Sequence, residues 1–181
     1  MSKLRTLIEE TVRAKNAGHF GIFTAADLAM MVGERPSPTF MKFLAKAASN
    51  SSLERVARGL YINNVAPPNS TGVLEKIASL LHKNHFMYVS LETELSRIGV
   101  ISQVPIRRLT MMTTGRSGEH KTKYGIIEFT HTKRSLDSLQ DGVYYDIESR
   151  VFRATKEQAI MDLRRVGRNV HMISEELNDA T

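Results

Sequence analysis

The stretch from Phe23 to Ile62 reads FTAADLAMMVGERPSPTFMKFLAKAASNSSLERVARGLYI, and it contains two helix starts followed by a basic hairpin pattern. Thr24 is predicted to be an N-cap, because Asp27 stands three residues later as in a capping box, and Gly33 ends that helix. Ser37-Pro38 opens the next helix, since proline in a first turn loses no hydrogen bond. The pattern therefore predicts two helices joined by a short turn.

The second of these helices is predicted to have one apolar face and one cationic face. Its apolar stripe consists of Phe40, Phe43, Leu44 and Ala47. At 100° per residue, the opposite side carries Thr39, Lys42, Lys46 and Ser49, with no acidic residue. A DNA-recognition helix needs this division, because its back packs on the domain and its front meets phosphates and base edges. Taken alone, the same pattern is also typical of a solvated surface helix.

A positively charged hairpin follows this helix directly. Residues 53–57 and 60–62 are predicted strands, and Arg58-Gly59 is the turn between them. Arg55 and Arg58 are placed to reach a DNA backbone or a flanking groove. With another predicted helix over residues 2–17, the order of elements in residues 1–66 is that of a winged helix-turn-helix domain. Ser37 and the start of the third helix are then expected to hold a phosphate, helped by the helix dipole.

The composition agrees with a globular protein that binds a polyanion. The 181-residue chain has a net charge of +6, and residues 1–66 hold nine Lys/Arg against five Asp/Glu. The excess of positive charge is therefore concentrated in the smaller segment, which favours polyanionic partners through counterion release. The absence of cysteine excludes disulfides, thiolate zinc sites and a cysteine nucleophile. With neither a long apolar run nor an apolar signal core near the N-terminus, we expect a cytoplasmic protein without a membrane partner.

Residues 67–181 are expected to form a second domain of α+β class with antiparallel strands. The polar segment NNVAPPNSTG, residues 63–72, is a predicted linker. The sequence then predicts helices over 73–81 and 90–99, the second with Ser90 as its N-cap. It also predicts one hairpin from 106–114 and 124–131, and another from 143–147 and 151–153. A second capping box at Thr155 and Gln158 begins a further helix, and residues 171–177 form a last short one.

The first of these hairpins carries a basic cluster that is a possible second binding surface for DNA or for a partner protein. Its members are Arg107, Arg108, Arg116, Lys121 and Lys123, with only Glu119 opposing them in the sequence. The alternative interpretation is an ordinary solvated hairpin.

Three patterns that resemble catalytic or metal sites are better explained by structure. Asp146, Glu148 and Arg150 suggest a metal-dependent nuclease, but arginine cannot give up a proton, and a charged turn is the simpler interpretation. The four histidines His82, His85, His120 and His131 match no familiar zinc spacing, so we expect solvated side chains. Ser117 in GRSGE matches a nucleophile elbow only in part and is interpreted as a hairpin turn. We therefore expect no enzyme activity, cofactor or metal.

Three motifs in succession resemble one known family. They are RVARGLYI (residues 55–62), YVSLETELSRIGVI followed by SQVP (88–105) and FRATKEQAIMDL (152–163). Together they are similar to the AbiEi family of type IV antitoxins, and the resemblance covers nearly the whole chain.

The resemblance implies a transcriptional autorepressor whose winged helix binds inverted repeats in its own promoter. It also implies a C-terminal domain that counteracts an AbiEii-like nucleotidyltransferase toxin without needing a stable complex. The basic cluster of the second domain would then face DNA or the toxin. Two alternatives remain open on the residues alone: a stand-alone winged-helix regulator with a ligand-binding or dimerisation domain, and an adaptor that binds only protein.

Overall fold

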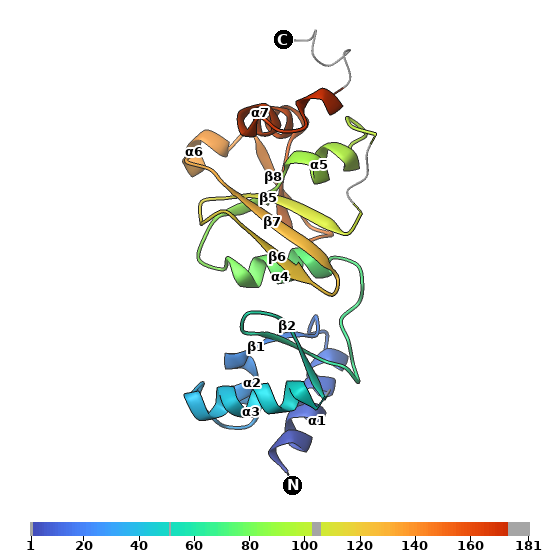
Figure 1. Cartoon of the computed structure of the whole chain (residues 1–181), viewed down its shortest axis with the longest axis vertical. Helices are drawn as coiled ribbons and strands as arrows, with labels where there is room; N and C mark the ends of the chain where they lie inside the picture. Colours follow the sequence, from blue (N-terminus) through green and yellow to red (C-terminus); the bar gives the residue numbers. More distant parts are fainter. Residues whose placement is uncertain (1, 51, 103–105, 174–181) are drawn as a thin grey trace. The chain divides into compact units, whose positions relative to one another are not determined.

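The computed structural model describes residues 2–50, 52–102 and 106–173, and it has a mixed α+β architecture with two sheets (Figure 1). The predicted α+β class is confirmed at this level. The chain divides into unit 1, Met1–Leu81, and unit 2, His82–Thr181. This division falls later than the predicted boundary after residue 66, because the helix that follows the linker groups with unit 1. Within the described residues, no helix is both long and apolar enough to cross a membrane.

Among its described residues, unit 1 contains four helices and one three-stranded sheet. Its elements are α1 (Lys3–Asn16), β1 (Ile22–Thr24), α2 (Ala25–Met31), α3 (Pro38–Ser49), β2 (Leu53–Ala57), β3 (Leu60–Asn63) and α4 (Val73–Leu81). The strands run antiparallel in the order β1-β3-β2. The short strand β1 is absent from the sequence-based prediction. Its place is fixed by pairing with β3, where Phe23 lies opposite Tyr61.

Local signals explain where the helices of unit 1 begin. The predicted capping box is confirmed, because the Thr24 amide donates to Asp27 Oδ2 at 2.7 Å and the Asp27 amide donates to Thr24 Oγ1 at 3.1 Å. Phe23 and Leu28, which flank this cap, are both buried in the core. The same core also contains Leu7, Phe40, Leu44, Ala47, Leu53 and Tyr61. The apolar back of α3 is thus held by α1, α2 and the sheet residues.

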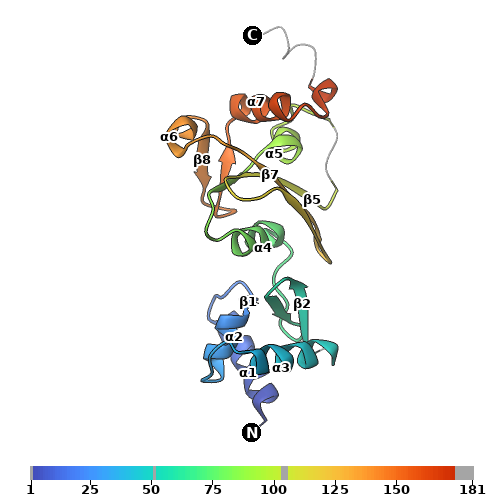
Figure 2. The ribbon, with the colours of Figure 1, turned by 60° about the vertical axis from the view of Figure 1, so that its left-hand side comes forward.

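Unit 2 is built on a six-stranded sheet of order β6-β7-β5-β4-β9-β8. Its elements are β4 (Met87–Val89), α5 (Leu91–Arg97), β5 (Arg108–Thr113), β6 (Gly118–Thr122), β7 (Gly125–His131), α6 (Leu136–Leu139), β8 (Val143–Asp146), β9 (Val151–Ala154), α7 (Lys156–Val166) and the 3-10 helix η1 (Val170–Met172). Helices α5 and α7 pack against each other near the sheet (Figure 2). Their buried residues join Tyr88, Met112 and Ala154 in one hydrophobic core.

The strand pairing of unit 2 differs from the predicted antiparallel pattern. The hairpin 143–147 with 151–153 is confirmed as β8–β9. The other predicted hairpin is wrong, because 108–113 (β5) pairs in parallel with 125–131 (β7), and the hairpin partner of β7 is β6. Strand β4 also pairs in parallel with β9. The sheet is therefore mixed, and residues 115–118 lead from β5 into β6 rather than closing a hairpin.

A buried polar cluster around Asp162 takes up two side chains, those of Ser90 and Gln158, that the sequence predicts to cap helices in unit 2. Ser90 stands at the N-cap of α5, but its hydroxyl donates to Asp162 at 2.8 Å instead of capping the helix. Thr155 does cap α7, whereas the Gln158 side chain binds Asp162 at 2.7 Å rather than closing a capping box. Tyr88 donates to the same carboxylate at 3.0 Å. Burial is the main cause that raises the pKa of Asp162 and of Tyr88. Of the predicted last helix, residues 174–177 lie outside the described residues.

Candidate nucleic-acid interface

Helix α3 presents a cationic face outward from unit 1. Phe40, Leu44 and Ala47 are buried, and Thr39, Lys42, Lys46 and Ser49 on the other side are exposed. This division follows from the 3.6-residue period, since only one stripe of a helix can face the core. No ion pair holds Lys42 or Lys46 within the described part of the chain, so both ammonium groups remain available to an anion.

Ser37 begins α3 as its N-cap. Its Oγ accepts the Phe40 amide at 3.1 Å, so one lone pair of this oxygen is already used by the helix. Pro38 has no amide hydrogen, which leaves the Thr39 amide as the remaining donor of the first three helical positions. A phosphate at this end would meet the Ser37 hydroxyl proton and the Thr39 amide.

The β2–β3 hairpin carries two arginines in different situations. Arg58 is exposed at the turn, which Gly59 makes possible with a φ of +72°. Arg55 is also exposed, but its Nε donates to the Ala57 carbonyl at 3.3 Å beside an irregularity in the strand register. No acidic partner of either arginine is found among the described residues. Arg58 is therefore the freer of the two cations.

Three acidic residues of unit 1 form ion pairs with cations outside α3 and the β2–β3 hairpin. Glu34 pairs with Lys3, Glu9 with Arg5 at 2.8 Å, and Glu10 with Arg13 at 2.9 Å. The sequence interpretation overlooked Arg35, which is exposed in the turn before α3 and has no ion pair in the ranges that the structure describes. In the sequence Arg35 is one basic residue between two predicted helices, a pattern too common to identify a DNA-binding residue.

The predicted basic cluster of unit 2 is not a continuous cationic surface. Arg108 donates to Glu119 at 3.0 Å and to Glu128 at 2.8 Å, and Lys121 lies 3.8 Å from Glu119. The expectation that only Glu119 opposes these cations is wrong, since β7 places Glu128 next to Arg108. Two members use their side chains locally: Arg107 donates to the Lys123 carbonyl at 2.7 Å, and Lys123 lies over the Tyr124 ring. Arg116 is exposed.

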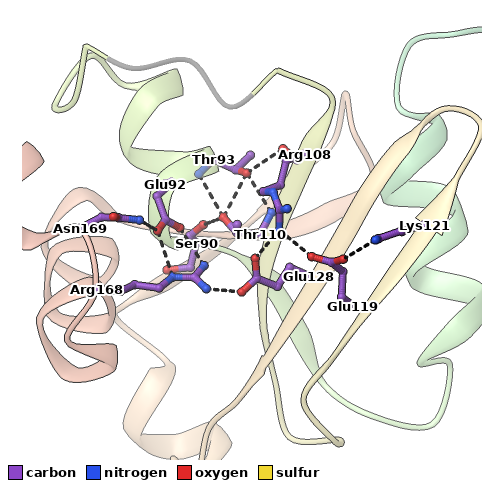
Figure 3. Close-up of polar contacts among 10 residues, drawn as sticks. All are labelled: Ser90, Glu92, Thr93, Arg108, Thr110, Glu119, Lys121, Glu128, Arg168 and Asn169. Carbon is purple, nitrogen blue, oxygen red and sulfur yellow. Dashed lines mark hydrogen bonds and ion pairs between the residues drawn. The ribbon is translucent and has the colours of Figure 1, made fainter.

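Arg108 belongs to a chain of ion pairs that links several elements of unit 2 (Figure 3). Glu128 also pairs with Arg168, and Arg168 donates to Glu92 at 3.0 Å. Burial raises the pKa of Glu92, but the hydrogen bonds from Arg168 and Asn169 outweigh burial and lower that pKa overall. Each charge in this network has a partner of opposite sign, and the ion pairs connect α5 and the segment after α7 to the sheet.

The histidines are only partly solvated, which corrects the sequence-based expectation. His82 is half-buried, its ring stacks on Phe129 with centroids 3.8 Å apart, and its Nδ1 lies 3.2 Å from Thr113 Oγ1. His120 is half-buried as well, whereas His85 and His131 are exposed. No group of three potential ligands that could hold a metal ion occurs in the described ranges.

His82 is expected to make the stability of unit 2 depend on pH. Its pKa is lowered, first by burial and then by His120 and His85. The unfolded chain therefore binds a proton before the folded one, and stability falls as pH drops below the unfolded value of about 6.5. Urea unfolding near neutral and near mildly acidic pH should show a smaller pH effect for His82→Phe than for the parent. An equal pH effect in both proteins would contradict this assignment.

The Asp146 carboxylate is used to fix the β8–β9 hairpin. It accepts the Ser149 hydroxyl and Arg153 Nε, the latter at 2.8 Å. These hydrogen bonds, Ser149 first, lower the pKa of Asp146 to about 2. Asp146 and Arg153 are thus each other's ion-pair partners, and this pairing explains these two charged residues without a bound metal. Ser117 has a comparable local role, since its Oγ accepts the His131 amide at 2.8 Å.

Comparison with models of known protein families gives no match for this chain, and comparison with curated proteins gives none either.

Proposed function

We propose that unit 1 is a winged helix-turn-helix module that binds double-stranded DNA, with α3 in the major groove and the β2–β3 hairpin as the wing. The order α1-β1-α2-α3-β2-β3 and the sheet order β1-β3-β2 support this interpretation. The observation that carries it is the outward face of α3, where Lys42 and Lys46 stand exposed and without an acidic partner among the described residues.

In this proposal the cations of unit 1 divide the work. Lys42 and Lys46 contact phosphates beside the major groove, and Ser37 with the Thr39 amide binds one phosphate at the start of α3. Arg58 reaches the DNA backbone or the minor groove from the wing. Arg55, on the same hairpin, adds a second positive charge beside Arg58. Phosphate contacts position the protein and set the salt dependence of affinity, but they carry no sequence information.

Titration of a duplex with the full-length chain tests the proposal. Retention of the duplex at low salt supports DNA binding if the logarithm of the affinity falls linearly as the logarithm of the salt concentration rises. Absence of any shift at low salt, together with salt-insensitive capture of a protein partner, would instead identify an adaptor.

We further propose that the chain is a cytoplasmic autorepressor and antitoxin, which the three motifs similar to AbiEi proteins support. Unit 2 would carry the antitoxin activity against a nucleotidyltransferase-like toxin. Nothing in the ion-pair chain of unit 2 requires a cofactor for such a role.

Co-expression with the neighbouring gene of the same operon separates the two activities. We expect the parent to restore growth of cells that express the toxin, and Lys42→Ala/Lys46→Ala to restore growth equally well from a foreign promoter. The reason is that both lysines belong to unit 1, whereas the antitoxin activity is proposed for unit 2. Failure of the parent to restore growth would remove the antitoxin role while leaving DNA binding intact.

A further inference from the structure

The outward face of α3 is poor in groups that can read a base by hydrogen bonding. Lysine or arginine reads guanine, and asparagine or glutamine reads adenine, through paired hydrogen bonds. Between Pro38 and Ser49 only the two lysines belong to this set. The Ser49 hydroxyl is already committed, because it donates to the Lys46 carbonyl at 2.8 Å. Apart from the two lysines, the face therefore offers mainly methyl groups.

Those methyl groups are exposed beside the cations. Ala45 lies three residues after Lys42, so the two are neighbours on one side of the helix, and Thr39 stands one turn earlier. Met41, whose residue is 39% exposed, adds an apolar group on the side of the helix next to Ala45. The C5-methyl group of thymine is the one apolar group that the major groove displays, and alanine and threonine methyls are its usual partners.

From this we infer that α3 recognises thymine methyl groups, with Ala45 and Thr39 as the specificity-determining residues, and that the preferred duplex is rich in A·T pairs. This inference rests on the proposed DNA-binding function. In this assignment Lys42 and Lys46 act as point charges on phosphates and not as readers of guanine.

The wing supports the same class of sequence independently. Arg58 is exposed at the hairpin tip, without an ion pair in the described parts of the chain, and Gly59 leaves the turn free of a side chain beside it. A·T tracts have a narrow minor groove with an enhanced negative potential that attracts an inserted arginine. Both parts of the module thus favour A·T pairs, one through methyl contacts and the other through groove shape.

The probe is a DNA duplex obtained by selection: the full-length chain is used to select binding sequences from a pool of random duplexes of roughly two helical turns. We expect the enriched duplexes to be rich in A·T pairs. Replacing thymine by deoxyuridine in the selected duplex removes only the methyl groups and should weaken binding roughly fourfold for each contacted methyl. Replacing guanine by 7-deazaguanine, which removes the N7 acceptor, should have little effect.

A variant cycle assigns the contact to a residue. Ala45→Gly should bind the thymine duplex more weakly and should lose the discrimination against deoxyuridine at one position. The ratio of the two affinities within each variant is the readout, since it is unaffected by any weakening of the helix by glycine. Ala48→Gly, at a half-buried position on another side of α3, is the matched control and should keep the parental ratio.

The outcomes separate this inference from the function on which it rests. Equal binding of thymine and deoxyuridine duplexes, or a loss confined to 7-deazaguanine, overturns methyl recognition even if Lys42→Ala/Lys46→Ala abolishes the shift. Retention of duplexes without enrichment of any sequence also overturns methyl recognition, whereas failure to retain any duplex at low salt overturns the DNA-binding function itself. Retained discrimination in Ala45→Gly together with its loss in Thr39→Ser removes Ala45 from the assignment and keeps Thr39.

Discussion

The Lys42→Ala/Lys46→Ala variant is expected to bind its duplex roughly a hundredfold more weakly than the parent at moderate salt, because each lysine supplies a charge-assisted contact worth about tenfold. Its plot of log affinity against log salt should be shallower by about two units, since two phosphates lose their partners. Both side chains are exposed and away from the core, so the fold should be unchanged. Fluorescence anisotropy with a labelled duplex at several salt concentrations measures both quantities.

The matched control removes the same charge from unit 2. Lys121→Ala/Lys123→Ala changes two lysines in the β6–β7 hairpin, where Lys121 lies near Glu119 and Lys123 lies over Tyr124. A much smaller loss is expected there if α3 forms the interface. Equal losses in the two variants would indicate that DNA responds to the net charge of the chain, and the assignment of α3 would be abandoned.

The Glu94→Ala variant is expected to lower the free energy of unfolding of unit 2 by about 3–5 kcal/mol, the cost of breaking a buried ion pair by removing one partner. The Glu94 side chain is completely buried and accepts Arg153 Nη1 at 2.9 Å and Arg97 Nε at 3.0 Å. Without it, Arg153 loses the carboxylate that its Nη1 contacts, and the buried guanidinium charge loses one acidic partner, while Asp146 remains as another.

Tyrosine fluorescence during urea unfolding is a suitable measurement, because the chain has no tryptophan and four of its five tyrosines, at positions 88, 124, 144 and 145, lie in unit 2. Glu9→Ala breaks an exposed pair with Arg5 and should leave the unfolding midpoint unchanged. A Glu94→Ala midpoint as high as that of Glu9→Ala would show that the pair contributes nothing to stability.

The features that the sequence predicted correctly depend on neighbours within a few residues. The Thr24–Asp27 capping box, the start of α3 at Ser37-Pro38 and the hairpin around Arg58-Gly59 all combine residues no more than four apart in the chain. Such patterns can be recognised in a sequence because each one fixes a local hydrogen bond or turn conformation. The exposure of Thr39, Lys42 and Lys46 followed from the helical period alone, once α3 had one apolar stripe.

Other features required segments that are distant in sequence. Strand β1 exists because it pairs with β3, and β5 lies beside β7 rather than β6 through backbone hydrogen bonds that carry no residue signature. The local cap expected at Ser90 gave way to Asp162, 72 residues away, since a buried carboxylate needs several donors.

The sequence by itself thus determined the helices of unit 1, the caps of α2 and α3 and the outward face of α3, because periodicity and capping act over one or two turns. Only the tertiary structure decided the order of the six strands, the neutralisation of Arg108 by Glu128 and the burial of Glu94 with Arg153. The physical reason is that those contacts join residues 20 and 59 positions apart, and their partners are chosen by packing of the whole unit.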